Sequence, residues 1–243
     1  MSVLSEIAEL KQKQRYDFED LRRVMAILRS EEGCPWDREQ DHHSIRSSLI
    51  EETYEVVEAI DTDNPTLLRE ELGDLLFQIM FHARIEDEAG VFDVGDVIDE
   101  ICKKMIHRHP HVFGTVEVAD SSEVLRNWES IKTEEKQRNT TLDKLRAIPP
   151  MMPALMRASK VGKKAGEAAG CDAAAVLALL ANEIETARAA LEKGNLDAER
   201  SVGRLLMQTT NLSRTLEVDA EYALTCEVER IIEQFAEKST KVE

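Results

Sequence analysis

The amino-acid sequence predicts an all-α protein in the form of a helical bundle. Three observations support this fold class. Apolar residues recur mostly at helical spacing, aromatic residues make up only 5% of the chain, and the 243 residues include only 10 glycines and 6 prolines. This length allows one large domain or two smaller ones, and either can bury a full core.

Helix start signals and the apolar periodicity define the expected elements in order. The clearest start is Asn64 followed by Pro65, because asparagine is a common N-cap and proline fits the first helical turn. Helices are predicted over residues 65–89, from 93 onward, and over 121–136, 154–168, 173–193, 196–217 and 219–238. The proline-rich segment 148–153 predicts a boundary between two modules, residues 1–147 and 148–243.

The second half of the chain repeats the pattern of the first. Residues 72–78 align with 202–208, a shift of 130 from Gly73 to Gly203, and residues 51–55 align with 182–186 after a slip of one position. The apolar positions are kept, but most acidic ones are lost. We infer a duplicated helical module, and the alternative is a chance match between two amphipathic helices.

Charge and cysteine usage restrict the function. A formal net charge of −17 argues against nucleic-acid binding, which depends on clustered Lys and Arg. The four cysteines are scattered without metal-binding spacing, as expected of reduced thiols. No signal peptide is recognisable, and no apolar run approaches the roughly 20 residues of a membrane helix. We therefore predict a cytoplasmic protein with neither nucleic acid nor membrane as a partner.

Four carboxylates on two consecutive helical segments are the main candidate site. Glu52 and Glu55 are three residues apart on the first segment, and Glu71 and Asp74 are three apart on the second. If the segments pack as an antiparallel hairpin, these side chains converge into an all-oxygen pocket. Such a pocket suits a hard cation such as Mg²⁺, usually together with substrate phosphates.

The helical positions of these acids favour a sheltered site. Glu52 falls beside an apolar stripe, where an ionised side chain is costly unless it is paired or bound to metal. Glu71 and Asp74 share a polar stripe with Gln78 and His82 on a helix that is otherwise largely apolar, so we expect this helix to be buried on several sides. We interpret His82 as a core or supporting residue rather than a metal ligand. The alternative is that the acids form an ordinary solvated face.

Two further pairs of residues could bind a phosphate ester. Lys104 and Arg108 are one helical turn apart and could bind phosphate oxygens. Trp128 and Lys132 are also one turn apart and offer a ring for a base and a cation for phosphate. Taken alone, each pair is more often a surface charge or a core anchor.

Together these residues resemble the MazG family of nucleoside triphosphate pyrophosphohydrolases, and the match is close over about residues 15–137. The motifs that carry the resemblance are Gly33-Cys34-Pro35-Trp36-Asp37 with Gln40 and His42, Glu51-Glu52-x-x-Glu55, Glu71-x-x-Asp74, Arg108-His109-Pro110-His111-Val112-Phe113, and Trp128-Glu129-x-Ile131-Lys132.

The resemblance implies an all-α bundle of this pyrophosphohydrolase type, completed by a second chain in a homodimer. It also implies Mg²⁺-dependent hydrolysis of (d)NTPs to the monophosphate and pyrophosphate, with Mn²⁺ as a possible substitute and a role in nucleotide pool housekeeping. Carried over by position, the metal ligands are Glu52, Glu55, Glu71 and Asp74, the candidate base is Glu51, and the nucleotide-binding residues are Lys104, Arg108, Trp128 and Lys132.

The second half departs from the family pattern. Ser201 and Arg204 replace the second acidic pair, and Asn182 and Thr186 interrupt the first. We therefore expect only the first module to be catalytic. Two alternatives stay open: a pyrophosphatase dedicated to dUTP, dCTP, a modified nucleotide or phosphoribosyl-ATP, and a non-catalytic, nucleotide-sensing interaction protein.

Overall fold

The computed structural model describes residues 2–135 and 140–240, and within these ranges it contains helices and no strand. The predicted all-α fold is therefore confirmed. The chain divides into two compact units, Met1–Trp128 and Glu129–Glu243. This division reflects internal packing, and the module boundary expected at residue 148 stays a prediction.

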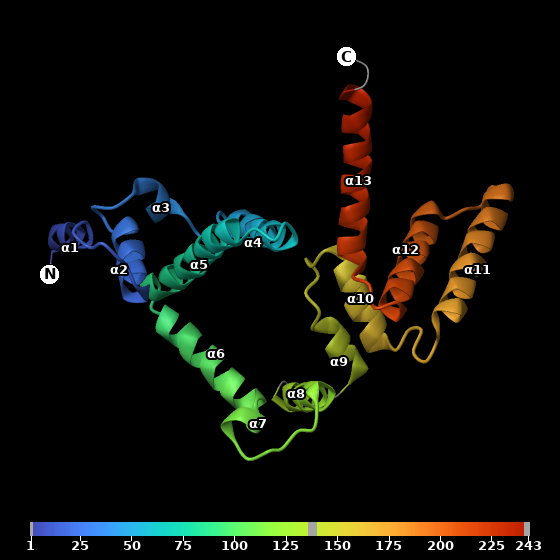
Figure 1. Ribbon diagram of the computed structural model, residues 1–243, viewed down its shortest axis with the longest axis horizontal. Coiled ribbons are helices and arrows are strands. Elements are labelled where there is room, and N and C mark those ends of the chain that lie inside the picture. Colours follow the sequence, from blue (N-terminus) through green and yellow to red (C-terminus); the bar gives the residue numbers. More distant parts are fainter. Residues whose placement is uncertain (1, 136–139, 241–243) are drawn as a thin grey trace. The chain divides into compact units, whose positions relative to one another are not determined.

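The helices of both units can be followed along the chain in Figure 1. The first unit contains α1 (Val3–Leu10), α2 (Phe18–Leu28), α3 (Pro35–Glu39), α4 (Arg46–Asp61), α5 (Pro65–Glu88), α6 (Val94–Arg108), α7 (Pro110–Phe113) and most of α8 (Ser121–Glu135). The second unit contains α9 (Thr141–Arg146), α10 (Ala154–Ala165), α11 (Ala173–Glu192), α12 (Ala198–Thr215) and α13 (Ala220–Thr240). Among the described residues, none of these helices has the length and apolar character needed to cross a bilayer.

Capping side chains set the helix starts that the sequence predicted. The side-chain oxygen of Asn64 accepts hydrogen bonds from the backbone N–H groups of Thr66 and Leu67, at 3.2 and 3.1 Å, and so begins α5. Asp93 and Asp96 form a capping box at the start of α6. The same device at Thr140 begins α9, a short helix that the sequence analysis did not predict.

The helices α4 and α5 form an antiparallel hairpin that positions the candidate site. They lie side by side (Figure 1), and a connection of three residues reverses the chain between them. Asp63 in this connection has a φ of 49°, a left-handed conformation that Asp tolerates better than most residues. Ala59 is fully buried in the hairpin, and its small side chain allows close helix packing.

The core of the first unit gathers around the second half of α5. Met80, Phe81 and Ala83 pack there with Met25 of α2 and Val94 of α6. Burying a side chain such as Phe81 contributes roughly 2–3 kcal/mol through loss of apolar contact with water.

The expectation that α5 is buried on several sides is wrong for the single chain. Leu72, Leu76 and Ile79 are 49%, 37% and 42% exposed. The physical reason is that the buried residues of α5 all fall between Met80 and Ala83, where α2 and α6 contribute to the core. The first half of the helix lies outside that core.

The segment that follows α2 is held in place by a close backbone approach and by one arginine. A Cβ on Gly33 would lie 2.0 Å from the carbonyl oxygen of Ile27, so only glycine fits this turn. Arg29 donates hydrogen bonds to the carbonyl oxygens of Asp37 and Gln40 and forms an ion pair with Glu88 of α5. The Gly33–Asp37 motif thus has a clear structural role.

The second unit contains a comparable hairpin of α11 and α12, which also lie side by side (Figure 1). α10 packs closely on α12 because Gly162 carries no side chain there; a Cβ would lie 2.6 Å from Oδ1 of Asn211. Asn211 is buried and donates to the Glu167 carboxylate at 3.1 Å. The two hairpins agree with a duplicated module, which stays a prediction.

Candidate functional site

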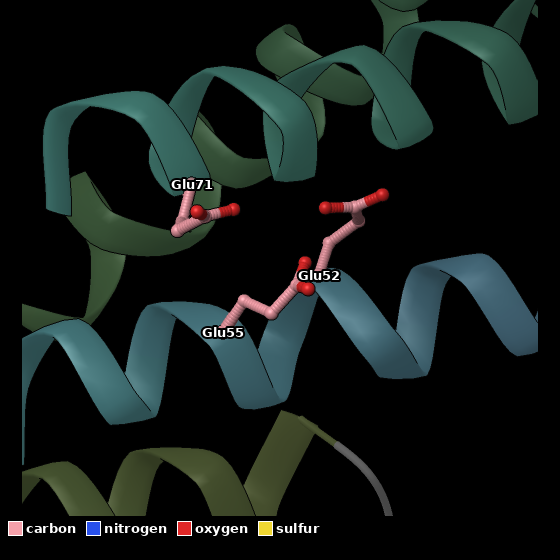
Figure 2. A group of neighbouring side chains, drawn as sticks. All are labelled: Glu52, Glu55 and Glu71. Carbon is pink, nitrogen blue, oxygen red and sulfur yellow. The ribbon is translucent and has the colours of Figure 1, made fainter. Parts of the chain in front are cut away.

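Three glutamates converge between the two helices of the α4–α5 hairpin. Glu52 and Glu55 come from α4 and Glu71 from α5, and Figure 2 shows their carboxylates pointing toward one another. One oxygen from each lies within 4.8 Å of the others. All three side chains are half-buried. We call this group the acidic cluster.

Helix geometry accounts for the convergence. Residues three apart on a helix project from the same face, which brings Glu52 and Glu55 to the side of α4 that faces α5. The antiparallel packing of the hairpin then places Glu71 opposite them. The convergence predicted from the sequence required the two segments to pack as an antiparallel hairpin, and the structure contains this hairpin.

The electrostatics of the acidic cluster are unfavourable to full ionisation. Burial raises the pKa of Glu52, followed by its hydrogen bond to Glu55 and by the charges of Glu55, Asp74 and Glu71. The pKa of Glu71 is also raised, first by burial and then by the charges of Glu55 and Asp74. Among the described residues, no Lys or Arg forms an ion pair with any of the three. The negative charge is therefore not balanced by the protein.

The other two acidic candidates lie at the margin of the cluster. Asp74 is exposed and is not part of the closest group, yet its charge contributes to the raised pKa of both Glu52 and Glu71. Glu51 is exposed on α4, next to Glu52. The structure thus brings three of the four predicted ligands together and places Asp74 near enough to interact electrostatically.

The donor set suits a divalent metal of the hard class. Every donor is a carboxylate oxygen, which Mg²⁺, Ca²⁺ and Mn²⁺ prefer over soft ligands. A bound cation would also supply the positive charge that the surrounding side chains lack. The residues present therefore fit the predicted metal.

The nucleotide-binding candidates lie on α6 and α8. The guanidinium of Arg108 lies 5.3 Å from the centre of the Trp128 ring, and Arg108 is only 6% exposed. Lys104 is exposed one turn before Arg108 on α6. Lys132 is half-buried one turn after Trp128 on α8, 3.9 Å from a carboxylate oxygen of Glu129. The structure brings Arg108 and Trp128 into direct contact, which the sequence did not predict.

The sequence also did not predict that a histidine of α5 pairs with a histidine of the turn before α4. His42 and His82 stack with their Nδ1 atoms 2.8 Å apart, and Nε2 of His42 lies 2.7 Å from the Glu86 carboxylate. Burial lowers the pKa of His82, followed by the charge of His42. His82 thus has a partner within the protein, in agreement with a supporting role. The sequence placed His82 on the polar stripe of α5 and His42 in the motif that begins at Gly33, but nothing linked the two residues, which are 40 positions apart.

The corresponding hairpin of the second unit carries an internal ion pair. Arg204 of α12, which aligns with Asp74, forms a salt bridge with Glu183 of α11, which aligns with Glu52. Under the duplication predicted from the sequence, this salt bridge takes the place of the acidic cluster.

An all-α protein with a carboxylate cluster on a helical hairpin is the class that the fold and site define. Residues 40–113 match the MazG nucleotide pyrophosphohydrolase domain. The chain is 39% identical over 228 residues to the nucleoside triphosphate pyrophosphohydrolase/pyrophosphatase MazG of Thermotoga maritima, covering 93% of this chain and 87% of the relative. It is 41% identical over 223 residues to the nucleoside triphosphate pyrophosphohydrolase of Escherichia coli K12, covering 88% and 84%.

A shorter match, 37% identical over 134 residues, relates it to the nucleoside triphosphate pyrophosphohydrolase of Mycobacterium tuberculosis, covering 54% of this chain and 41% of the relative. The chain belongs to the MazG nucleotide pyrophosphohydrolase family. The family and the class of enzyme predicted from the sequence are confirmed.

Proposed function

We propose that this protein hydrolyses nucleoside triphosphates, (d)NTPs, to the monophosphate and pyrophosphate in a reaction that requires a divalent metal. The observation that carries the proposal is the acidic cluster of the α4–α5 hairpin, with three carboxylates within 4.8 Å and no balancing cation among the described residues. The names of the two relatives that match most of the chain support the same reaction.

Glu52, Glu55, Glu71 and Asp74 would hold Mg²⁺, and Mn²⁺ could replace it because both prefer oxygen ligands. When bound, the metal supplies charge neutralisation at the phosphates and lowers the pKa of a coordinated water. Its binding also removes the repulsion among the three carboxylates. The acidic cluster is thus arranged for a ligand of opposite charge.

Glu51 is our candidate for the general base. It is exposed on the same helix as Glu52 and can accept the proton of the attacking water. In the reaction the water oxygen bonds to phosphorus, the bond to the pyrophosphate oxygen breaks, and the proton passes to the carboxylate. Glu51→Gln would lower kcat while the metal-dependent change in stability persists.

Lys104, Arg108 and Lys132 would bind the phosphate oxygens, and Trp128 would stack on the base. The contact between Arg108 and Trp128 supports this assignment, since it holds a planar cation against an aromatic ring. Stacking on a ring tolerates different bases, so this contact favours a broad range of triphosphates over a single dedicated nucleotide.

We also propose that a second copy of the chain covers the hairpin in a homodimer. Ile50, Tyr54 and Val57 of α4 and Leu72 and Leu76 of α5 are all exposed in the single chain. Apolar side chains grouped along one hairpin commonly mark an interface. Light scattering after size-exclusion chromatography would show twice the chain mass, and a monomer would contradict this part of the proposal.

The second unit would be non-catalytic. Its salt bridge between Arg204 and Glu183 fills the position of a metal-binding carboxylate with a cation. An intact second unit should therefore not restore the turnover that is lost when the acidic cluster of the first unit is altered.

A panel of (d)NTPs with detection of released pyrophosphate tests the proposal. Wild type in millimolar Mg²⁺ should release pyrophosphate, and Glu71→Gln should reduce the rate by about hundredfold or more, because metal ligands contribute strongly to both affinity and turnover. Glu100→Gln on α6 is the matched control, because it removes one exposed acid outside the hairpin. Pyrophosphate release by Glu71→Gln at the wild-type rate would refute the site assignment. Saturable nucleotide binding without release would favour the nucleotide-sensing alternative.

A further inference from the structure

The second unit contains a cavity lined mainly by lysines. Its volume is about 500 Å³, within the range of small-molecule sites. The lining residues are Glu129, Lys132, Thr133, Lys144, Lys160, Lys163 and Lys164. All of them belong to the second unit. Lys132 is also one of the residues proposed above to bind the substrate's phosphates, so the case for a separate site is argued from Lys144, Lys160, Lys163 and Lys164. We call this the lysine cavity.

The lysine cavity lies in the most basic part of an acidic chain. Residues 140–166 contain six Lys and Arg and a single acid, Asp143, so this segment has a formal charge of +5 while the whole chain has −17. Such a local reversal of sign attracts anions, because the field near a cluster of like charges is set mainly by that cluster.

Two adjacent helices bring the lysines together. Lys160, Lys163 and Lys164 lie on one face of α10 at helical spacing, and Lys144 comes from α9, which contacts α10. Lys163 and Lys164 also interact favourably with the C-terminal end of α10. The favourable charge at a helix C-terminus does not account for the other two lysines. Lys160 lies one turn earlier on α10, and Lys144 lies on α9.

These four lysines are not neutralised by the protein. Within the ranges 2–135 and 140–240, none of the four forms a salt bridge or a side-chain hydrogen bond. Glu129 is the one acid among the described lining residues, and it lies 3.9 Å from Lys132. The remaining positive charges repel one another, and an anion with several oxygens would relieve that repulsion.

We propose that the lysine cavity is a second anion-binding site, whose ligand is a polyphosphate group such as inorganic pyrophosphate or the phosphate chain of a nucleotide. Its described lining contains no aromatic side chain on which a base could stack, so phosphates rather than a base are recognised. It also differs in chemistry from the acidic cluster, since lysine ammonium groups bind phosphate without a metal.

Calorimetric titration with pyrophosphate in the presence of EDTA tests the proposal on the full chain. Without a divalent metal the acidic cluster repels phosphate, so the binding measured reports on cationic residues, either those of the lysine cavity or Lys104 and Arg108. The variants of Lys160 and Lys163 distinguish the two, because these lysines line only the cavity. Wild type should bind pyrophosphate, and the double variant Lys160→Ala/Lys163→Ala should bind it at least about tenfold more weakly, because each charge-assisted hydrogen bond contributes roughly that factor. Both side chains are exposed, so their removal leaves the packing of α10 intact.

The control is the double variant Lys193→Ala/Lys238→Ala, which removes the same total charge from exposed positions outside the cavity. It should bind pyrophosphate as wild type does, and so should Glu71→Gln, because the lysine cavity does not depend on the acidic cluster. Lys144→Glu on α9 is an independent variant and should also weaken binding. No heat of binding by wild type, or an equal loss in the control, would overturn the proposal.

Titrations with other ligands separate the possible sources of the phosphate group. Orthophosphate should bind more weakly than pyrophosphate because it offers fewer oxygens to the lysines. A nucleoside triphosphate should bind about as well as inorganic tripolyphosphate, because the described lining offers no aromatic ring to the base. A single-stranded oligonucleotide that bound more tightly than either, and that lost binding in Lys160→Ala/Lys163→Ala, would overturn the assignment to a small phosphorylated ligand.

Discussion

Replacing Glu52 by glutamine should make the metal-free protein more stable and the enzyme inactive. Glu52 shares the acidic cluster with Glu55 and Glu71, and no cation of the described protein balances the three charges. Glutamine keeps the size and the hydrogen-bonding capacity of the side chain and removes one negative charge. The substitution therefore separates electrostatic repulsion from packing.

The magnitude follows from the separation of the charges. Two carboxylates 4.8 Å apart repel each other by about 0.9 kcal/mol in a water-like dielectric and about 3.5 kcal/mol at an effective dielectric constant of 20. The side chains are only half-buried, so solvent screening favours the lower value. We expect Glu52→Gln to add about 1 kcal/mol to the free energy of unfolding in EDTA, which raises Tm by about 3 °C.

Thermal unfolding with and without metal provides the assay. In EDTA the variant should unfold at a higher temperature than wild type. In Mg²⁺ the order should reverse, because a metal at about a hundred times its Kd stabilises wild type by about 2.7 kcal/mol and the variant binds it poorly. The control Glu100→Gln removes an exposed acid on α6 and should show the wild-type response to Mg²⁺.

Two results would refute this reasoning. A lower Tm for Glu52→Gln in EDTA would mean that the carboxylate is held by favourable interactions rather than repelled. An unchanged Mg²⁺ response, together with wild-type release of pyrophosphate, would mean that Glu52 does not contribute to a metal site.

Three further predictions concern pH, packing and nucleotide binding. Because the pKa of Glu52 is raised above its ordinary value of 4.5, the metal-free protein loses stability as pH rises from 4.5 through the raised pKa. The advantage of Glu52→Gln in EDTA should therefore vanish in unfolding curves recorded below pH 4.5. Gly33→Ala places a Cβ 2.0 Å from a backbone oxygen and should lower the free energy of unfolding in denaturant by about 1–3 kcal/mol, whereas Gly203→Ala, with no atom within 4 Å, should not lower it. Arg108→Lys keeps the charge but loses the planar contact with Trp128, so KM for a nucleoside triphosphate should rise about tenfold in steady-state kinetics, and an unchanged KM would contradict the assigned role.

Much of the helical structure could be predicted from local signals. The start of α5 at Asn64 and Pro65 and the start of α6 at Asp93 depend on capping groups within a few residues, which are visible in the sequence. α9 has the same kind of signal at Thr140, and six residues of helix were too short to stand out from the polar stretch around them. The extent of burial along α5 could not be predicted, because it depends on which part of α5 packs against α2 and α6.

The part of the candidate site that depends on the geometry of a single helix could be predicted from the sequence. A spacing of three residues brings Glu52 and Glu55 to one face of α4. The same spacing predicted that Glu71 and Asp74 share a face of α5. The contact of Arg108 with Trp128 joins two helices, and the pairing of His42 with His82 joins the turn before α4 to α5. Such contacts depend on the angle and the register at which helices pack, and local sequence does not encode those directly.

The sequence by itself determined the class of fold, the family, and which carboxylates share a helix face, because capping, periodicity and i to i+3 spacing act within one or two turns of the chain. Only the tertiary structure decided that three glutamates meet within 4.8 Å, that the first half of α5 stays exposed in the single chain, and that lysines of α9 and α10 line one cavity. The reason is that these outcomes depend on how helices distant in sequence approach one another, and that approach minimises the free energy of the whole packed unit rather than of any one segment.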